Sequence, residues 1–104
     1  MNVEKYLPLT VTTFYILSSL IDSGHGYSTM QRVEELSNGK VRIAAGTMYG
    51  AIETLTKLKL IKAIPNTDKR RKVYQTTSLG LNVLRQETKR LKYLVEVAET
   101  YELN

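Results

Sequence analysis

Apolar side chains recur along most of this chain at spacings of three and four residues, which is typical of amphipathic helices. The pattern predicts four helices, at 10–22, 27–37, 46–59 and 78–103. The first segment is rich in β-branched residues, so a buried strand is the alternative, but its length favours a helix. Thr10 is a suitable N-cap for it. Asn38 and Gly39 tolerate the left-handed conformation that ends helices, so they should stop the second one.

Three short segments are predicted to be strands, and the first of them alternates polar and apolar side chains, as half-buried strands do. They lie at 40–44, 60–65 and 72–77. The last two are joined by the turn NTDKRR, which predicts a β-hairpin. The predicted order is helix, helix, short strand, helix, hairpin and long helix. The fold class is therefore mainly α with a small β-hairpin.

The third predicted helix has one apolar stripe and one polar face. The stripe consists of Met48, Ile52 and Leu55, at spacings of four and three. The opposite face carries Thr47, Tyr49, Gly50, Glu53, Thr54 and Lys57. A glycine inside a helix costs about 1 kcal/mol relative to alanine, and close approach of another backbone is one reason to keep it. The polar face is therefore a candidate contact surface.

The positive charge is concentrated at the predicted hairpin turn. The net charge is +5, and residues 57–72 alone carry seven cations and one anion. Four of these cations are adjacent: Lys69, Arg70, Arg71 and Lys72. Like charges held side by side repel one another unless a polyanion neutralises them, which predicts nucleic acid or an anionic membrane surface as partner. A role in solubility alone is the alternative.

Composition excludes several classes of protein. The chain has no cysteine, which excludes disulfides and thiolate metal sites and fits a cytoplasmic location. No apolar run approaches the roughly 20 residues of a membrane span, and the N-terminus does not resemble a signal peptide. The only histidine, His25, has no carboxylate cluster beside it. We expect it to be structural at a helix start, with no metal, no cofactor and no enzymatic activity, because phosphate loops and nucleophile motifs are also absent.

Two helices joined by a short connection, then a ribbon with a basic tip, are the layout of a winged helix-turn-helix. The major groove of DNA is about 12 Å wide and admits one helix. The helix at 46–59 would lie there, and the hairpin tip would lie over phosphates or the minor groove. We therefore expect a winged-helix DNA-binding domain over 1–77 and a dimerisation helix over 78–104, with double-stranded DNA as partner.

Four features in this order resemble the PadR family of transcriptional regulators. They are HGY at 25–27, AAGTMYGAIETL at 44–55, RRKVYQTTSLG at 70–80 and a single C-terminal helix. The likeness is to the short subclass, in which that helix builds a dimer. It implies a homodimeric repressor of a pseudo-palindromic operator, sometimes released by a small aromatic molecule. The chain has no tryptophan, whereas a drug-binding subgroup of the family stacks flat ligands on one.

The motifs assign residues to three surfaces. The family's G-T-L-Y falls on Gly46 to Tyr49, and its T-x-x-G on Thr77 to Gly80. The expected DNA contacts are Tyr27, Gly46, Thr47, Tyr49, Gly50, Thr54, Lys57, Lys69, Arg70, Arg71 and Lys72. The expected dimer seam is Leu84, Leu91, Leu94, Val95, Ala98 and Tyr101. A small aromatic effector would contact Phe14, Tyr15 and Tyr101.

Each assignment has an alternative. Tyr27 and Tyr49 could serve packing, and Tyr74 more often pairs across a hairpin than reads DNA. Glu53 could accept a hydrogen bond from a cytosine amino group, but a solvated helix carboxylate is the favoured interpretation. The last helix could pack back on its own domain, at least over its first turns. The alternative function is a winged-helix module for protein–protein contact.

Overall fold

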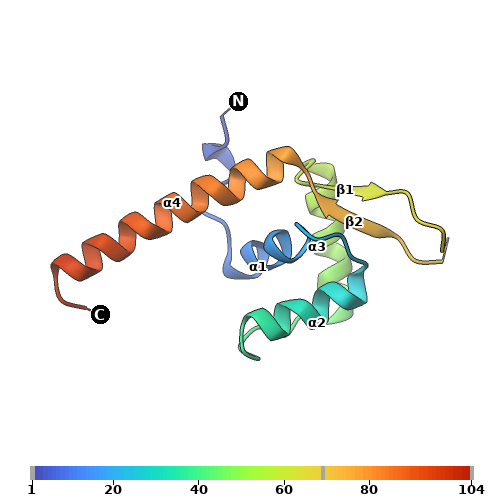
Figure 1. The fold of residues 1–104 in the computed structure, drawn as a ribbon, viewed down its shortest axis with the longest axis horizontal. Helices are drawn as coiled ribbons and strands as arrows, with labels where there is room; N and C mark the ends of the chain where they lie inside the picture. Colours follow the sequence, from blue (N-terminus) through green and yellow to red (C-terminus); the bar gives the residue numbers. More distant parts are fainter. Residues whose placement is uncertain (1, 69, 104) are drawn as a thin grey trace.

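The computed structural model describes residues 2–68 and 70–103. In these ranges, four α-helices and one antiparallel hairpin follow a short 3-10 helix (Figure 1). The elements are η1 (Glu4–Tyr6), α1 (Val11–Ser19), α2 (Gly26–Leu36), α3 (Ala45–Lys57), β1 (Ile61–Ile64), β2 (Val73–Thr76) and α4 (Ser78–Thr100). The predicted fold class, mainly α with a small β-hairpin, is confirmed.

The signals at the helix ends act as the sequence predicts. The Thr10 hydroxyl accepts a hydrogen bond from the Thr13 amide at 3.1 Å and caps α1, so the buried-strand alternative is excluded. α1 ends at Ser19 rather than at residue 22. After α2, Asn38 and Gly39 have φ of 54° and 78°. Both lie in the left-handed region, which confirms them as the stop.

The short strand predicted at 40–44 is wrong. This segment forms no strand, and β1 and β2 are the two strands of the described residues. The alternation did reflect burial, since Ile43 is buried and Val41 half-buried. The free edge of β2 is bridged instead by Gly24, whose N–H and C=O pair with Tyr74 at 3.0 and 2.9 Å. Residues 40–44 pair with neither β1 nor β2, so their alternation marks a loop with one buried side and not a strand.

The core lies where α1, α2, α3, the hairpin and the first half of α4 meet (Figure 1). The α3 stripe (Met48, Ile52 and Leu55) is at most 4% exposed, as predicted. The other apolar side chains with 1% exposure or less are Ile16, Leu17, Leu20, Val33, Leu60, Ile61 and Val83. α4 also contributes Leu84, which is 6% exposed. Leu84 therefore belongs to the core of its own chain and leaves little surface for the dimer seam to which the sequence assigned it.

α4 is longer than the core that it covers. Its 23 residues correspond to about 35 Å at 1.5 Å per residue. Its first half packs across α1, and its second half continues beyond the other elements, on the opposite side of the molecule from the hairpin (Figure 1). The basic turn of the hairpin and the free end of α4 therefore lie at opposite ends of the molecule.

Gly80 allows α4 to begin against the hairpin. The Thr77 hydroxyl caps α4 by accepting a hydrogen bond from the Gly80 amide at 3.0 Å, and it donates one to the Lys59 carbonyl at 2.7 Å. A Cβ atom on Gly80 would lie 2.6 Å from Thr76 Cγ2 and would also overlap the carbonyl oxygen of Leu60. In the T-x-x-G motif, Thr77 therefore caps α4, and Gly80 lets the start of α4 pack closely against the backbone at Leu60.

Gly80→Ala should lower the free energy of unfolding by about 1–3 kcal/mol, because an added Cβ against backbone cannot be relieved by a rotamer change. Urea unfolding followed by circular dichroism measures the change. Gly50→Ala in α3 is the matched control, since no described atom lies within 4 Å of a Cβ there. It should raise stability by up to about 1 kcal/mol. Equal stability of Gly80→Ala and wild type would contradict the packing argument.

A buried carboxylate ties the N-terminal segment to α4. Glu87 is 1% exposed, and its Oε2 accepts a hydrogen bond from the Leu9 amide at 2.8 Å. The guanidinium of Arg90 donates two hydrogen bonds to the same carboxylate. Hydrogen bonding to Arg90 lowers the pKa of Glu87 below its ordinary value of 4.5, with help from the Leu9 amide, while burial acts in the opposite direction.

Glu87→Gln should cost about 1–3 kcal/mol near neutral pH, because the charge-assisted pair with Arg90 is lost. The folded-state pKa is lowered from 4.5, so the stabilisation by ionised Glu87 is present above that value and is lost as the pH falls through the folded-state pKa. The gap in unfolding free energy between wild type and Glu87→Gln should therefore narrow on acidification to about pH 3. Glu96→Gln, an exposed carboxylate of α4, is the control and should change stability by less than about 0.5 kcal/mol. A gap independent of pH would contradict this account.

Candidate nucleic-acid interface

α3 turns a small, polar face away from the core. Because successive residues turn by about 100°, the face opposite the α3 stripe is centred on Gly46, Gly50, Glu53 and Lys57, with Thr47 on one flank. All five residues are exposed. Apart from the neighbouring backbone of α3 itself, no described atom lies within 4 Å of a Cβ built on Gly46 or Gly50. The α3 backbone is therefore bare here and open to close approach by another molecule.

The two flanks of this face line different hollows. Thr54 borders a hollow that also contains Lys5 and Tyr6 of the N-terminal segment, so it lies on the flank away from the hairpin. Thr56 borders the groove on the hairpin side, although sequence reasoning did not include it in the contact surface. Thr56 lies two helical turns after Tyr49, which lines the same groove. That spacing is the signal that could have identified it.

The hairpin and its connecting turn, residues 61–76, form the wing. The Asn66 side-chain amide closes the turn by donating to the carbonyls of Asp68 at 3.0 Å and Arg71 at 2.8 Å. The Asp68 carboxylate accepts a hydrogen bond from the Arg70 amide at 3.0 Å. These are the local bonds for which Asn and Asp are favoured in turns. Lys69, one of the expected DNA contacts, lies outside the described residues.

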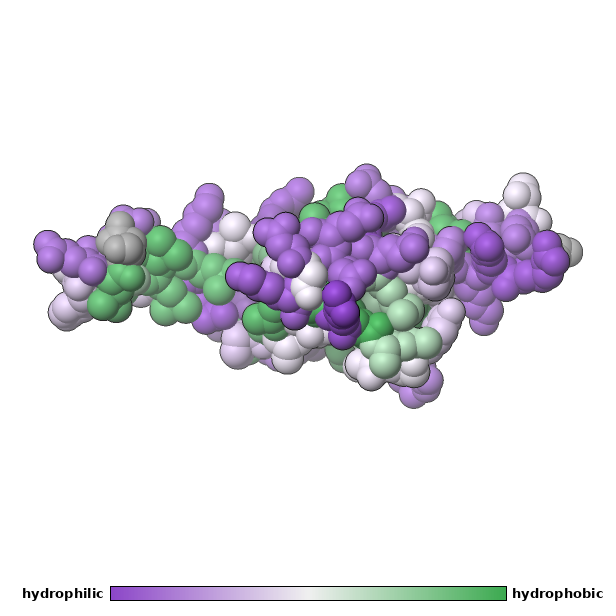
Figure 2. Space-filling view, turned by 90° about the horizontal axis from the view of Figure 1, so that it is seen from below, coloured by the Kyte–Doolittle hydropathy of each residue, from purple (hydrophilic) through white to green (hydrophobic). Residues whose placement is uncertain are grey.

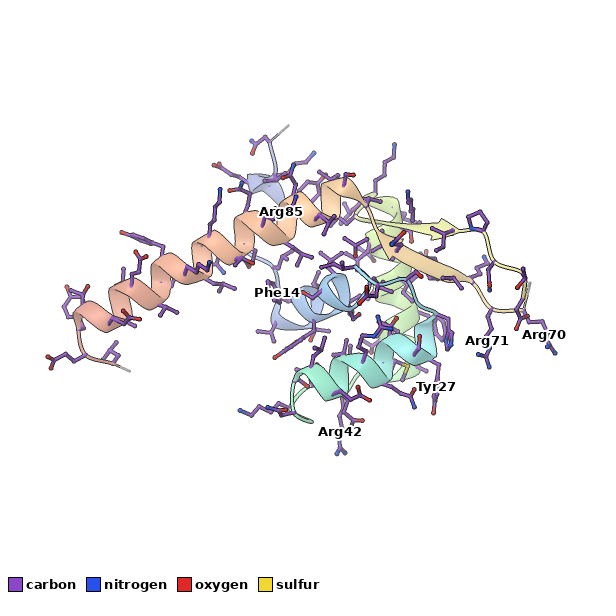
Figure 3. The ribbon with its side chains drawn as sticks, viewed as in Figure 1. Phe14, Tyr27, Arg42, Arg70, Arg71 and Arg85 are labelled. Atoms are coloured by element: carbon purple, nitrogen blue, oxygen red, sulfur yellow. The ribbon has the colours of Figure 1, made fainter. Side chains whose placement is uncertain are left out.

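The cations of the wing are held at its surface. Arg70 pairs with Asp68 at 3.5 Å, and its side chain is 93% exposed. Such an exposed pair contributes little stability, so the guanidinium can exchange Asp68 for another anion. Arg71 and Lys72 are exposed as well. Figure 3 shows Arg70 and Arg71 projecting from the wing on the same side of the molecule as Tyr27 at the start of α2.

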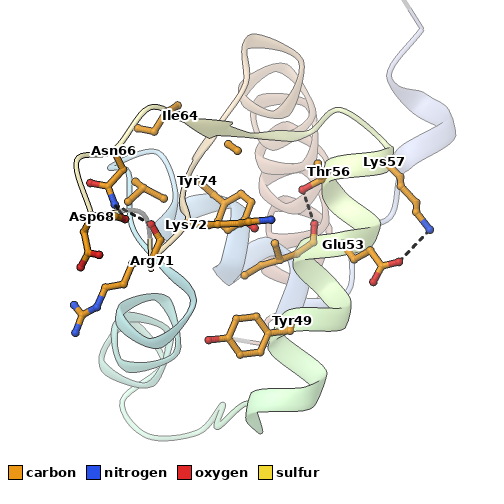
Figure 4. A pocket seen from close by; sticks show the side chains of 13 residues that line it. Tyr49, Glu53, Thr56, Lys57, Ile64, Asn66, Asp68, Arg71, Lys72 and Tyr74 are labelled. Carbon is orange, nitrogen blue, oxygen red and sulfur yellow. Dashed lines mark hydrogen bonds and ion pairs between the residues drawn. The ribbon is translucent and has the colours of Figure 1, made fainter.

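A groove of about 720 Å³ separates α3 from the wing (Figure 4). Lys72 and Tyr74 extend toward it from the wing, and Tyr49 and Glu53 from α3. Tyr74 also pairs across the hairpin with Ala63. Cross-strand pairing is the structural role that the sequence predicted for Tyr74. The charged residues of the lining are Glu53, Lys57, Asp68, Arg71 and Lys72. Lys57 and Glu53 form an exposed ion pair at 3.2 Å, so Glu53 is a solvated carboxylate in this structure.

The HGY motif begins α2 and packs against Tyr49. His25 is the N-cap, since its Nδ1 accepts a hydrogen bond from the Ser28 amide at 3.3 Å. The structural role predicted for His25 is thus confirmed. Gly26 lies under the ring of Tyr49, where a Cβ would be 2.8 Å from Cε1. Tyr49 remains 57% exposed and Tyr27 60% exposed. Packing and surface contact, the two roles weighed for Tyr49, are therefore compatible.

The second half of α4 is apolar and uncovered within this chain. Figure 2 shows hydrophobic residues gathered at this end of the molecule and hydrophilic ones at the wing end. Among the expected seam residues, Leu91, Leu94, Val95 and Tyr101 are exposed and Ala98 is half-buried. Sequence reasoning missed further exposed apolar residues: Tyr93, Val97 and Leu103. The apolar surface is thus wider than the predicted seam.

The expected effector residues are not all together. Phe14 and Tyr15 line a hollow of about 300 Å³ between α1 and α4, whose lining also includes Glu87, Arg90 and Leu91. Tyr101 lies at the far end of α4 and does not line this hollow. Within one chain, the structure therefore brings two of the three residues to one place.

A helix with a free polar face beside a basic two-stranded wing defines a winged helix-turn-helix protein. Residues 16–86 match the family described as transcriptional regulator PadR-like. This match spans more than half of the chain, so the chain belongs to the PadR-like family of transcriptional regulators, a family of DNA-binding regulators rather than enzymes.

Several solved structures share this fold. A PadR family regulator from Eggerthella lenta is 27% identical, with a TM-score of 0.70 over 89% of this chain and 83% of that one. A transcriptional regulator from Clostridium thermocellum is 23% identical, with a TM-score of 0.74 over 96% and 93%. A PadR family regulator from Clostridium difficile is 22% identical, with a TM-score of 0.69 over 86% and 96%. No curated protein sequence matches the chain.

In residues 2–68 and 70–103, no helix is both long and apolar enough to cross a membrane. No group of three or more histidine, aspartate or glutamate side chains there could hold a metal ion.

Proposed function

We propose that this protein is a homodimeric repressor that binds a pseudo-palindromic operator, with α3 in the major groove and the wing over the adjacent backbone. The observation that carries the proposal is the juxtaposition, across one groove, of the bare face of α3 and the cationic wing. α3 has 13 residues and is about 20 Å long. The major groove, about 12 Å wide, accepts a helix of this kind.

The two parts of the interface have different tasks in this proposal. The outer face and flanks of α3 read the base sequence through Thr47, Tyr49, Gly50, Thr54 and Lys57. Gly46, which has no side chain, lets the backbone of α3 approach the DNA closely. The wing neutralises phosphates and positions the protein through Arg70, Arg71 and Lys72. Lys69 is included with them on the basis of the sequence. Tyr27 approaches the backbone from the start of α2. Repression, rather than activation, is proposed from the family resemblance.

Selection of bound duplexes from a random library tests the proposal. A homodimer should enrich a site with two-fold symmetry, and its half-sites should lie about 10–10.5 base pairs apart or a multiple of that distance. Placing the recovered site over a promoter should then reduce transcription in vitro. Enrichment of no sequence by a folded protein would contradict operator recognition, and enrichment of an asymmetric site would contradict the homodimer.

The alternative function, a winged-helix module for protein contact, predicts little affinity for nucleic acid. Retention on immobilised calf-thymus DNA at rising salt distinguishes the two. A DNA-binding wing should hold the protein on the column until salt screens the phosphates, because each phosphate contact releases counterions. Elution at low salt, together with failure of the library selection, would favour the protein module.

We further propose that a small aromatic effector, where one acts, binds beside Phe14 and Tyr15 in the hollow between α1 and α4. A contribution from Tyr101 would have to come from a second copy, because Tyr101 does not line this hollow in its own chain. Thermal shift and tyrosine fluorescence against phenolic acids and planar cationic dyes test the idea. No response across such a panel would favour a regulator without an effector in this place.

A further inference from the structure

The cap of α2 fixes the proton of the single histidine. The Ser28 amide donates its hydrogen to Nδ1 of His25 at 3.3 Å, so Nδ1 is the acceptor and carries no proton. In a neutral imidazole one nitrogen accepts and the other donates. The remaining nitrogen, Nε2, therefore carries the hydrogen while His25 caps α2.

This Nε2–H faces another donor. Nη1 of Arg71 lies 3.4 Å from Nε2, and a guanidinium has no acceptor. Two donors cannot bond to each other, so with this tautomer both groups are free to donate to an acceptor placed beside them. The neutral ring and the charged guanidinium thus converge on a position suited to an oxygen anion.

The surroundings of this position are those of an anion site. A hollow of about 500 Å³ is lined by His25, Tyr27, Tyr49, Arg70, Arg71 and Lys72, among others, and no carboxylate is part of the lining in the described residues. Its donors come from α2, α3 and the wing. At the start of α2, the amides of His25 and Ser28 bond within the cap, and the amide of Thr29 bonds to the His25 carbonyl. The donors that converge on the hollow are the side chains of His25 and Arg71.

We propose that His25 and Arg71 hold one backbone phosphate of the bound duplex, with the Nε2–H of neutral His25 and the Arg71 guanidinium as paired donors. The hollow shares Tyr49, Arg71, Lys72 and Tyr74 with the groove beside α3. A phosphate here therefore belongs to the strand that flanks the base pairs facing α3. This rests on the proposed function and adds to it a phosphate contact that depends on a helix cap.

His25→Asn separates the two roles of the histidine. Asparagine is a good N-cap, so this variant keeps α2 capped and removes the Nε2–H donor. His25→Ala removes both. His25→Asn should melt close to wild type and should bind operator and scrambled duplexes about two- to tenfold more weakly, as for a lost hydrogen bond.

Salt dependence and coupling test the shared phosphate. Arg71→Ala should flatten the slope of log affinity against log salt by about 0.9 per subunit. His25→Asn should leave the slope unchanged, because a neutral donor releases no counterion. The loss in the double variant should differ from the product of the two single losses by more than about twofold, as for residues with a common partner. Independent losses, or unchanged affinity of His25→Asn, would overturn the pairing.

Because His25 is the only histidine, long-range proton–nitrogen NMR reports its protonation without ambiguity. The free protein should show Nδ1 bare and Nε2 protonated, and adding operator duplex should shift the Nε2–H resonance and protect it from exchange. A protonated Nδ1, or a response to inorganic phosphate with none to duplex, would overturn the assignment. Wild-type protein that binds no duplex at all would instead overturn the proposed function.

Discussion

Replacing Arg70 and Arg71 together by alanine should weaken binding to operator and unrelated DNA alike. It should also flatten the slope of log affinity against log salt by about 2 per subunit, since each lost phosphate contact lowers it by about 0.9. Both side chains are exposed, and the pairing of Arg70 with Asp68 is too weak to compete with a phosphate. Fluorescence anisotropy with operator and scrambled duplexes over a salt series measures both effects.

Gly50→Leu is the contrasting variant for the same assay. Leucine raises helix propensity and meets no described atom within 4 Å at Cβ, so the fold should be intact. A leucine on the bare face of α3 would hold the helix away from the groove. Operator affinity should fall while binding to scrambled DNA stays near wild type. Gly50→Ala, with a smaller side chain, should show a lesser loss.

The two variants must differ for the assignment to stand. If Arg70→Ala with Arg71→Ala leaves the salt slope unchanged, the wing does not neutralise phosphate. If the wing variant and Gly50→Leu show the same profile on the two duplexes, wing and α3 do not divide positioning from sequence reading. Either result contradicts the proposed interface while leaving the winged-helix fold intact.

Leu91→Asp with Val95→Asp should dissociate the proposed dimer. This prediction rests on the apolar second half of α4, where Leu91 is 39% and Val95 55% exposed in the single chain. In a dimer seam each aspartate would bury an unpaired charge, at a cost of several kcal/mol. The monomer should stay folded, because neither residue belongs to the core. Sedimentation velocity at low micromolar concentration and circular dichroism measure the two outcomes.

Lys89→Asp is the matched control, because Lys89 is exposed and lies on the opposite side of α4 from Leu91 and Val95 by helical spacing. It should leave the sedimentation unchanged. A double aspartate variant that still sediments as a folded dimer would place the seam elsewhere, for instance around Tyr93 and Val97. The operator should then be retested, because a dimer of different geometry implies a different half-site spacing.

Much of the fold followed from local patterns. Helical periodicity predicted all four α-helices, Thr10 predicted the cap of α1, and the Asn38-Gly39 pair predicted the end of α2. The cluster of cations at a turn predicted an exposed basic wing. These features are decided within a few residues, because a cap, a stop or a turn satisfies its own backbone groups with near neighbours. Sequence alone therefore determined the order of the four helices and the hairpin, and the polar face of α3.

Tertiary structure decided what depended on competition between distant segments. Residues 40–44 alternate like a strand, but the segment that bridges to β2 is the one with Gly24, and no local pattern encodes which segment pairs with a distant strand. The periodicity of α4 marks Leu84 as apolar, yet only the packing of α4 on the core assigns it to the inside rather than to a partner. Likewise, the meeting of His25 with Arg71 joins residues 46 positions apart. The sequence determines which side chains are apolar and which can donate hydrogen bonds. The tertiary structure decides which of them lie next to one another.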